Sequence, residues 1–224
     1  MINKKELSRT YSNRFKGLES YRNKVWNVLV TEFFSKWLAS DAKVLDLGCG
    51  YGEFINNVAT AERHAMDLNP DTMNYLDANI HFHQQDCLEP WTIQAGSLDL
   101  VFTSNFFEHL SNKEALSKTI QQIYSHLKPN GRLIMLGPNI AALKGHYWDF
   151  WDHHIPLSDQ SACELLELHK FKIERSISHF LPYNMVRIRK RPLALVKLYV
   201  KLPFIWRFFG AQFLIVAQKI DVLE

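Results

Sequence analysis

The sequence predicts an α/β protein with a doubly wound, mostly parallel, seven-stranded Rossmann-like sheet, an antiparallel last strand and helices on both faces. Three observations predict this fold. Five short apolar segments alternate with segments of helical periodicity. A glycine-rich turn, Gly48-Cys-Gly-Tyr-Gly52, directly follows the first of these apolar segments. Two more strand-like segments close the chain, and such a terminal pair is typical of an antiparallel addition to a parallel sheet.

Helices are predicted where apolar residues recur at a spacing of three or four. Val25, Leu29 and Phe33 show this spacing near the start of the chain, and Leu116 and Ile120 show it near the middle. The predicted helices span residues 18–38, 52–59, 113–127 and 158–169, the last with Ser158 as N-cap, and a further helix entry lies at Asn69-Pro70-Asp71.

Strands are predicted where apolar residues run together or alternate with polar ones. The run over 98–103 is almost wholly apolar, as expected of a strand that is buried on both faces. The predicted strands span residues 42–47, 63–68, 80–85, 98–103, 132–136, 171–178 and 212–219. Ligands of such sheets bind beyond the carboxyl ends of the strands, so the loops that follow the strands are expected to hold the functional residues.

Length and composition exclude several classes of protein. The 224 residues are 47% hydrophobic and 22% charged, which is typical of globular proteins and excludes wholesale disorder and a coiled coil. Three widely spaced cysteines argue against a disulfide framework or a zinc knuckle. The polar N-terminus carries no secretory signal, and no apolar run is long enough to span a bilayer. We therefore expect a cytoplasmic protein with no transmembrane segment.

The chain is expected to form one domain over 1–224, without internal repeats or a linker. Residues 1–40 form an N-terminal helical extension in this interpretation, and residues 181–210 form an insertion between the last two strands. The net charge of +3 is small for a protein that binds nucleic acid, so no such partner is expected. The oligomeric state cannot be inferred from the sequence.

The glycine turn after the first strand is the first candidate ligand site. Gly48, Gly50 and Gly52 allow the backbone to approach a ligand closely. Their G-x-G-x-G spacing differs from the G-x-G-x-x-G spacing of nicotinamide-binding proteins, which argues against a dehydrogenase. Asp46, two residues before the first glycine, disfavours a pyrophosphate and favours a cationic or amino-bearing ligand. A purely structural turn is the alternative.

The segment from Asp46 to Gly52 resembles motif I of the class I S-adenosylmethionine-dependent methyltransferases, and the chain is similar to the type 11/12-like members of that family. Later motifs follow in the order of the family over about 43–137: Asp67 after the second strand, Asp86 in Gln-Gln-Asp-Cys, Ser97-Leu-Asp-Leu-Val-Phe and Leu127-Lys-Pro-Asn-Gly-Arg-Leu. The resemblance implies that S-adenosyl-L-methionine is the methyl donor and S-adenosyl-L-homocysteine the product.

The resemblance also implies which residues bind the donor. Asp67 would hold the two ribose hydroxyls and Asp86 the adenine amino group, while a helix cap or a solvated carboxylate is the alternative for both. Cys49 and Cys87 are expected to pack beside the ligand without being reactive. The expected donor-binding residues are Asp46, Gly48, Cys49, Gly50, Tyr51, Gly52, Asp67, Leu68, Asp86, Cys87, Asn105 and Phe106.

Candidate catalytic groups follow the fourth and fifth strands. Glu108 and His109 open the first of these loops, and the second, 145–155, holds three His, two Asp and four aromatic residues. A side chain that lies near the transferred methyl group can take the proton of the acceptor. The expected catalytic residues are Glu108, His109, His153 and His154. Hydrogen-bonded histidines that merely stabilise the loop are the alternative.

This pattern also resembles the small-RNA 2′-O-methyltransferases and the ubiquinone-pathway O-methyltransferases, in which two carboxylates and two histidines hold a divalent metal. Glu108, His109 and His153 match three of those four positions, but Asn105 replaces the outer Glu and is a weaker ligand. A divalent metal is therefore not favoured. The other histidines that the interpretation considers, His64, His81, His83, His126 and His169, are expected at the edge or the surface.

The extensions at both ends suggest further roles. Arg14 or Arg22 would meet the carboxylate of the donor, or else form a surface salt bridge. The stretch 187–209 mixes seven cationic residues with many apolar ones, which fits a lid over the acceptor, a membrane-surface element or a helical pair packed on the sheet edge.

The expected function is methyl transfer to a hydroxyl or other heteroatom of a small-molecule acceptor, which includes sugar- or lipid-linked molecules. RNA 2′-O-methylation is one alternative, and the low net charge argues against it. A donor-binding protein without transfer activity is another, and the histidine-rich loop argues against it.

Overall fold

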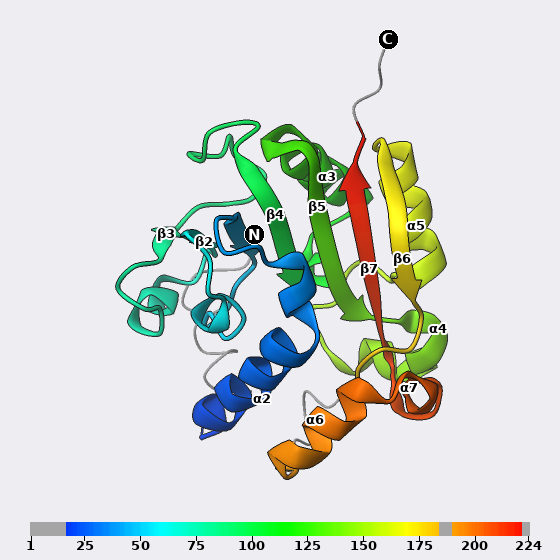
Figure 1. Ribbon diagram of the computed structural model, residues 1–224. Helices are drawn as coiled ribbons and strands as arrows, with labels where there is room; N and C mark the ends of the chain where they lie inside the picture. Colours follow the sequence, from blue (N-terminus) through cyan, green and yellow to red (C-terminus); the bar gives the residue numbers. More distant parts are fainter. Residues whose placement is uncertain (1–16, 184–189, 221–224) are drawn as a thin grey trace.

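The computed structural model describes residues 17–183 and 190–220 and shows one seven-stranded mixed sheet with the order β3-β2-β1-β4-β5-β7-β6 (Figure 1). Strands β1 to β5 pair in parallel, and β7 runs antiparallel to both of its neighbours. The predicted fold is confirmed, with the antiparallel strand inside the sheet and β6 at its edge. The strands are β1 (Lys43–Leu47), β2 (Glu62–Met66), β3 (His81–His83), β4 (Leu98–Ser104), β5 (Leu127–Pro138), β6 (Phe171–Ile177) and β7 (Gln212–Lys219).

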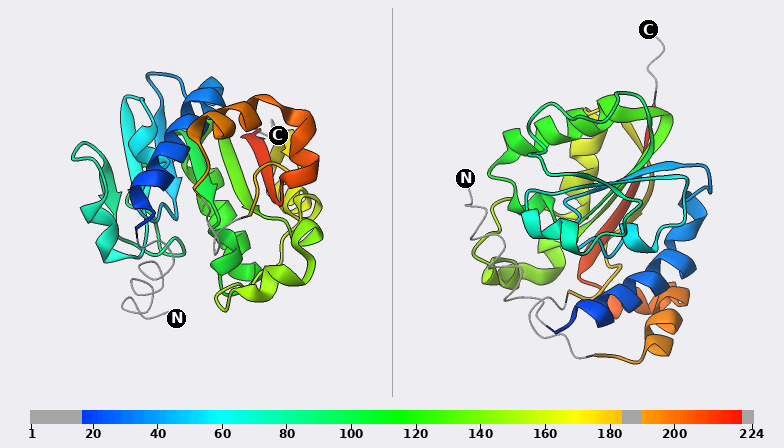
Figure 2. Two further views of the ribbon diagram at one scale, coloured as in Figure 1. Left: turned by 90° about the horizontal axis from the view of Figure 1, so that it is seen from below. Right: turned by 90° about the vertical axis from the view of Figure 1, so that its left-hand side faces the viewer.

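Helices cover both faces of the sheet (Figures 1 and 2). On one face, α3 (Lys113–His126) and α5 (Asp159–Leu168) bury their apolar sides, including Ile120 and Leu166. On the other face, α2 (Glu19–Glu32), α6 (Leu193–Lys201) and α7 (Pro203–Phe209) contribute residues such as Leu29, Val200 and Trp206. Shorter elements are α4 (Ile140–Leu143), η1 (Phe34–Trp37), η2 (Ile55–Asn57), η3 (Pro70–Asn74), η4 (Phe107–His109) and η5 (Lys144–Asp149).

Two predicted helices differ from those observed. The helix predicted over 18–38 divides, because Phe33 leaves helical geometry and η1 follows it. The helix predicted over 52–59 is only the single turn η2, because Val58 is already extended. The reason lies in packing: Trp26 of α2 contacts the rings of Phe54 and Phe102 edge-on, so α2 covers the face of the sheet on which a longer helix would lie.

The fifth strand starts earlier than predicted. Leu127 already pairs with Leu98, and the register shifts before Arg132 pairs with Leu100. Residues 129–131, which lie between the predicted helix 113–127 and the predicted strand 132–136, are therefore an irregularity within β5, which spans Leu127–Pro138.

The prediction that five histidines lie at the edge or surface is wrong for two of them. His64 on β2 and His126 at the end of α3 are both buried. His64 lies between Glu62 and His83, to which its two ring nitrogens are hydrogen-bonded, and His126 packs its ring on Trp91. On the edge strand β3, His81 is exposed and His83 is half-buried, and His169 is also half-buried.

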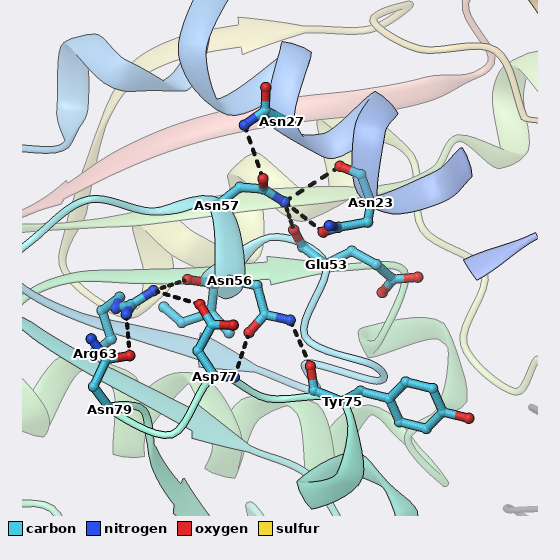
Figure 3. Close-up of polar contacts among 10 residues, drawn as sticks. Asn23, Asn27, Glu53, Asn56, Asn57, Arg63, Tyr75, Asp77 and Asn79 are labelled. Carbon is cyan, nitrogen blue, oxygen red and sulfur yellow. Dashed lines mark hydrogen bonds and ion pairs between the residues drawn. The ribbon is translucent and has the colours of Figure 1, made fainter. Parts of the chain in front are cut away.

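Side-chain amides tie α2 and η3 to the loop that follows the glycine turn, as Figure 3 shows. The amide nitrogen of Asn57 donates to the side-chain oxygen of Asn23 at 2.7 Å, and Asn27 donates to the side-chain oxygen of Asn57 at 3.0 Å. Asn56 donates to the carbonyl of Tyr75 at 2.8 Å. These bonds fix the position of the loop that carries the candidate ligand site.

Candidate functional site

A cavity of about 1260 Å³ lies beyond the carboxyl ends of β1, β2 and β4. One side of it is formed by the glycine turn and by acidic residues, and the other side by apolar residues of α2, α6 and α7. The volume exceeds that of an ordinary pocket for one small molecule, so the cavity has room for two ligands side by side.

The glycine turn requires its glycines. Gly48, Gly50 and Gly52 have φ values of 69°, 57° and 72°, which are left-handed conformations that other residues rarely adopt. A side chain at Gly48 would also clash with the ring of Phe106, and one at Gly52 would clash with Leu76. Gly48 and Gly50 line the cavity, whereas Gly52 shapes the turn without lining it.

Asp67 lies just after β2 and lines the cavity. Its Oδ2 accepts a hydrogen bond from the backbone amide of Gly50 at 2.8 Å, and its Oδ1 accepts one from the amide of Asn69 at 2.8 Å. Burial raises the pKa of Asp67, while these backbone hydrogen bonds oppose the rise. Each carboxylate oxygen can accept more than one hydrogen bond, so Asp67 can bind two ligand hydroxyls as well.

Asp46 and Glu53 make this side of the cavity acidic. Burial raises the pKa of Asp46 well above its usual range, and the nearby charges of Glu53 and Asp67 raise it further. Arg22 of α2 pairs with Glu53 at 2.6 Å, so the structure shows a salt bridge at Arg22. The other candidate, Arg14, lies outside the described residues. With Asp67 and Asp86, four carboxylates line this part of the cavity, which favours a cationic or amino-bearing ligand.

The remaining expected donor-binding residues also line the cavity: Cys49, Tyr51, Leu68, Asp86, Cys87, Asn105 and Phe106. Burial raises the pKa of the Cys87 thiol to about 11 and that of Cys49 well above its usual range, so neither is poised as a thiolate. Asp86 Oδ1 accepts a hydrogen bond from the amide of Leu88 at 2.9 Å, which closes a turn, and no helix begins there for Asp86 to cap. This carboxylate therefore both lines the cavity and holds the turn.

The structure brings three of the four expected catalytic residues together. Glu108, His109 and His153 each place one ligand atom within 4.8 Å of the others. The backbone amides of His154 and Ile155 donate to the carbonyl of Glu108 at 2.7 and 3.2 Å, which holds the two loops side by side. His109 and His154 line the cavity, whereas Glu108 and His153 lie behind its lining.

Hydrogen bonds orient both imidazoles in the same way. His109 Nδ1 lies 2.9 Å from the carbonyl of Asp152, and His153 Nδ1 lies 2.8 Å from the carbonyl of Tyr147. A carbonyl only accepts, so Nδ1 donates in each ring, and the neutral ring keeps its lone pair on Nε2. His153 Nε2 lies 3.4 Å from the hydroxyl of Tyr183. Two imidazole lone pairs beside a carboxylate suit a proton acceptor and equally suit a divalent cation.

Sequence analysis missed two polar residues of the site. Tyr183 lies in the insertion, where no pattern marks it. Gln212 lines the cavity, is buried, and donates to the carbonyl of Pro182 at 2.9 Å, while its Oε1 has no hydrogen-bond partner within 17–183 and 190–220. A signal for Gln212 existed: an antiparallel last strand begins where its parallel neighbours end, so its first residue lies at the ligand-binding edge.

Comparisons with known proteins agree with this geometry. Residues 18–175 match the methyltransferase domain family. The chain is 30% identical over 126 residues to malonyl-[acyl-carrier protein] O-methyltransferase of Paenibacillus sp. (strain JDR-2), a match that covers 49% of this chain and 44% of that protein. It is 25% identical over 122 residues to methyltransferase str2 of Strobilurus tenacellus, covering 53% and 43%. The chain thus spans less than half the length of these curated relatives.

A solved structure shows the same fold. The crystal structure of a SAM-dependent methyltransferase from Archaeoglobus fulgidus superposes with a TM-score of 0.67 at 19% identity, covering 92% of this chain and 99% of that one. The family match spans more than half of the chain and includes the glycine turn and Asp67. The chain therefore belongs to the methyltransferase domain family and has the fold of class I S-adenosylmethionine-dependent methyltransferases.

Proposed function

We propose that the protein methylates a hydroxyl or other heteroatom of a small-molecule acceptor that carries a sizeable apolar portion. The observation that carries this proposal is the two-sided cavity, with carboxylates and the glycine turn on one side and apolar side chains on the other. The donor occupies the acidic side, where Asp67 accepts hydrogen bonds from its ribose hydroxyls. The acceptor then occupies the apolar side.

The apolar side combines residues of α2, α6 and α7 with residues of the strands β4 and β5 and of the segment 181–182. One polar atom stands out there: the Oε1 of Gln212 accepts no hydrogen bond within the described part of the chain. An acceptor hydroxyl or amine would satisfy this atom, which is otherwise costly to bury. The residues of the apolar side include Val25, Trp26, Leu29, Phe102, Leu136, Leu181, Pro182, Leu195, Val196, Leu198, Tyr199, Ile205 and Phe209.

The donor supplies a methyl group that is already activated by the positive charge of its sulfonium. The protein therefore has to align the acceptor heteroatom with that methyl group and to exclude water. In this proposal His109 takes the proton from the acceptor heteroatom, because it lines the cavity and its Nε2 carries the lone pair. His153 and Glu108 lie next to it and stabilise the resulting charge. His154 borders the acceptor from the same loop.

If a divalent cation is bound, Glu108, His109 and His153 are the residues that would hold it, and the ion would lower the pKa of the acceptor hydroxyl. The three donors fit such an ion in type and spacing. Asn105, the position at which the resemblance expects a fourth ligand, lines the cavity, and its Oδ1 is buried without a hydrogen-bond partner in the described chain.

A series of alcohols tests the proposed acceptor class. The alcohols share one reactive hydroxyl and differ in the size of the apolar group, and methyl transfer from radiolabelled donor is measured for each. We expect kcat/KM to rise with the apolar group, and Gln212→Leu to lower kcat/KM while donor affinity stays unchanged. Equal rates for short polar and long apolar alcohols would contradict the proposal.

A further inference from the structure

Helices α6 and α7 expose an unusual amount of apolar surface. Leu195, Leu198, Phe204, Phe208 and Phe209 are each more than half exposed. All five lie within 15 consecutive residues, whereas the other large exposed apolar side chains of the described chain are scattered over several elements. Monomeric soluble domains seldom leave such a cluster uncovered, and its presence indicates a surface for binding.

The same part of the chain is strongly basic. Residues 175–220 contain nine of the 26 lysines and arginines and none of the 23 acidic residues. Lys197 and Lys201 both pair with the single carboxylate of Glu32, at 2.5 and 3.0 Å, which leaves the surface positive. Arg207 lies over the ring of Phe208 at 4.9 Å, so cation and aromatic ring are presented together. A basic and aromatic surface complements anionic lipid headgroups.

This surface is continuous with the cavity. Leu195, Leu198 and Phe209 are exposed to solvent and also line the cavity, so the apolar side of the cavity reaches the surface at these helices. Figures 1 and 2 show α6 and α7 beside α2 at one end of the molecule. An acceptor with an apolar chain would enter at this point directly from a lipid phase.

Charge argues against a second copy of the chain as the occupant. In a two-fold dimer through this surface, the cations of one copy would face the cations of the other. No helix within the described ranges is long and apolar enough to cross a bilayer.

From these observations we infer that α6 and α7 dock the enzyme on the surface of an anionic phospholipid bilayer, with Phe204 and Phe208 inserted among the headgroups. The docking itself does not depend on methyl transfer. Only the entry of a lipid-borne acceptor, through the opening of the cavity at Phe209, rests on the proposed function.

Vesicle co-sedimentation tests the inference with the full chain. The probes are vesicles of phosphatidylcholine alone and of phosphatidylcholine mixed with phosphatidylglycerol. We expect the wild type to sediment with the mixed vesicles, to bind the neutral ones at least about tenfold more weakly, and to be released by high salt. Phe204→Ser/Phe208→Ser should reduce binding to the mixed vesicles by about tenfold or more.

The two substituted residues are exposed and do not line the cavity, so donor affinity should be unchanged, and calorimetry with S-adenosyl-L-homocysteine checks that the variant is folded. Leu168→Ser, which removes an exposed apolar side chain from α5, is the matched control and should bind vesicles like the wild type. Equal vesicle binding by wild type and double variant would overturn the inference. A wild type that does not bind anionic vesicles would also overturn it. This includes the case in which the wild type is a dimer by light scattering and the double variant is a monomer.

Discussion

Arg22 and Glu53 join α2 to the glycine turn through an ion pair that is largely buried, with Nε 2.6 Å from Oε1 and side-chain exposures of 18% and 11%. Glu53 lies close enough to Asp46 to raise the pKa of that buried carboxyl. The guanidinium therefore compensates charge that would otherwise be concentrated beside the donor site. Together with the amides of Asn23 and Asn27, it makes α2 a structural part of the site.

The first prediction concerns this pair. Arg22→Met should lower the free energy of unfolding by about 2 kcal/mol, because Glu53 is left buried without its cation. Adding Glu53→Gln should recover part of the loss, and urea unfolding of the two single variants and the double variant gives the coupling energy. Lys128→Met removes a more exposed pair with Asp99 and should cost only about 0.5 kcal/mol. A double variant as unstable as the sum of the two single variants would refute the coupling.

A second prediction concerns the donor. Asp67→Ala should weaken the binding of S-adenosylmethionine by about 1.5 to 3 kcal/mol, because charge-assisted hydrogen bonds to the ribose hydroxyls are lost. Isothermal calorimetry measures the change. Asp41→Ala removes an exposed carboxylate that does not line the cavity and should leave the affinity as it is. The ribose assignment fails if both variants bind the donor equally well.

The third prediction addresses the glycine turn. Gly50→Val should abolish donor binding, because its φ of 57° disfavours a β-branched residue and the side chain would occupy ligand volume. Circular dichroism should show a largely unchanged fold. Gly145→Val is the control, since a Cβ there meets nothing within 4 Å, and it should bind the donor normally. Normal binding by Gly50→Val would place the donor elsewhere.

The sheet was predictable from sequence because its central strands, such as β4, carry apolar runs and the motifs keep a fixed order along it. Asp67 and the glycines could be placed for the same reason, since strand ends determine where loops begin. Helix 52–59 was not predictable as the single turn η2. Its length is limited by α2, a distant segment, and local periodicity holds no information about that contact.

The candidate catalytic cluster was predictable as a set of loops but not as a geometry. Parallel strands β4 and β5 deliver Glu108 and His153 to the same edge, which sequence order implies. The hydrogen bonds to the carbonyls of Tyr147 and Asp152 orient the imidazoles, and backbone carbonyls leave no trace in a sequence. The burial of His64 could not be predicted from the sequence for a similar reason, because it depends on the cross-strand partner His83.

That histidine pair gives a prediction about pH. His64 Nδ1 and His83 Nε2 lie 2.8 Å apart, so one ring must accept and therefore be neutral. Burial and, to a smaller extent, the charges of His64, His81 and Lys43 lower the pKa of His83 to about 4. Burial also lowers the pKa of His64, against the effect of Glu62. Between about pH 6.5 and 4, the unfolded chain consequently binds more protons than the folded chain.

The contribution of these two groups to stability is therefore complete above about pH 6.5 and is lost as the pH falls toward 4. Urea midpoints measured across this range should fall less steeply with decreasing pH for His83→Gln than for the wild type. His146→Gln, which changes a histidine whose side chain is 84% exposed, should follow the wild type. Identical slopes for all three proteins would show that the His64–His83 pair does not cause the loss of stability at low pH.

The last prediction separates the two chemistries that the cluster of Glu108, His109 and His153 can support. His109→Ala or His153→Ala should lower turnover by about 10²-fold or more while donor affinity changes little, because the imidazoles act on the acceptor rather than on the donor. His154→Ala is the matched control, since its exposed side chain lies in the same loop outside the cluster, and its loss of turnover should be smaller.

Metal dependence then decides the mechanism. If imidazole alone accepts the proton, a chelator leaves turnover unchanged, and turnover rises with pH because only the neutral ring can accept. If a divalent ion acts, the chelator abolishes turnover and added magnesium or manganese restores it, and Glu108→Gln then weakens metal binding in direct titration. Glu108 is decisive because it is buried behind the lining, where it stabilises an imidazolium in the first case and coordinates a cation in the second. Full turnover in both His→Ala variants would exclude both mechanisms and move the acceptor chemistry to the surface around Gln212.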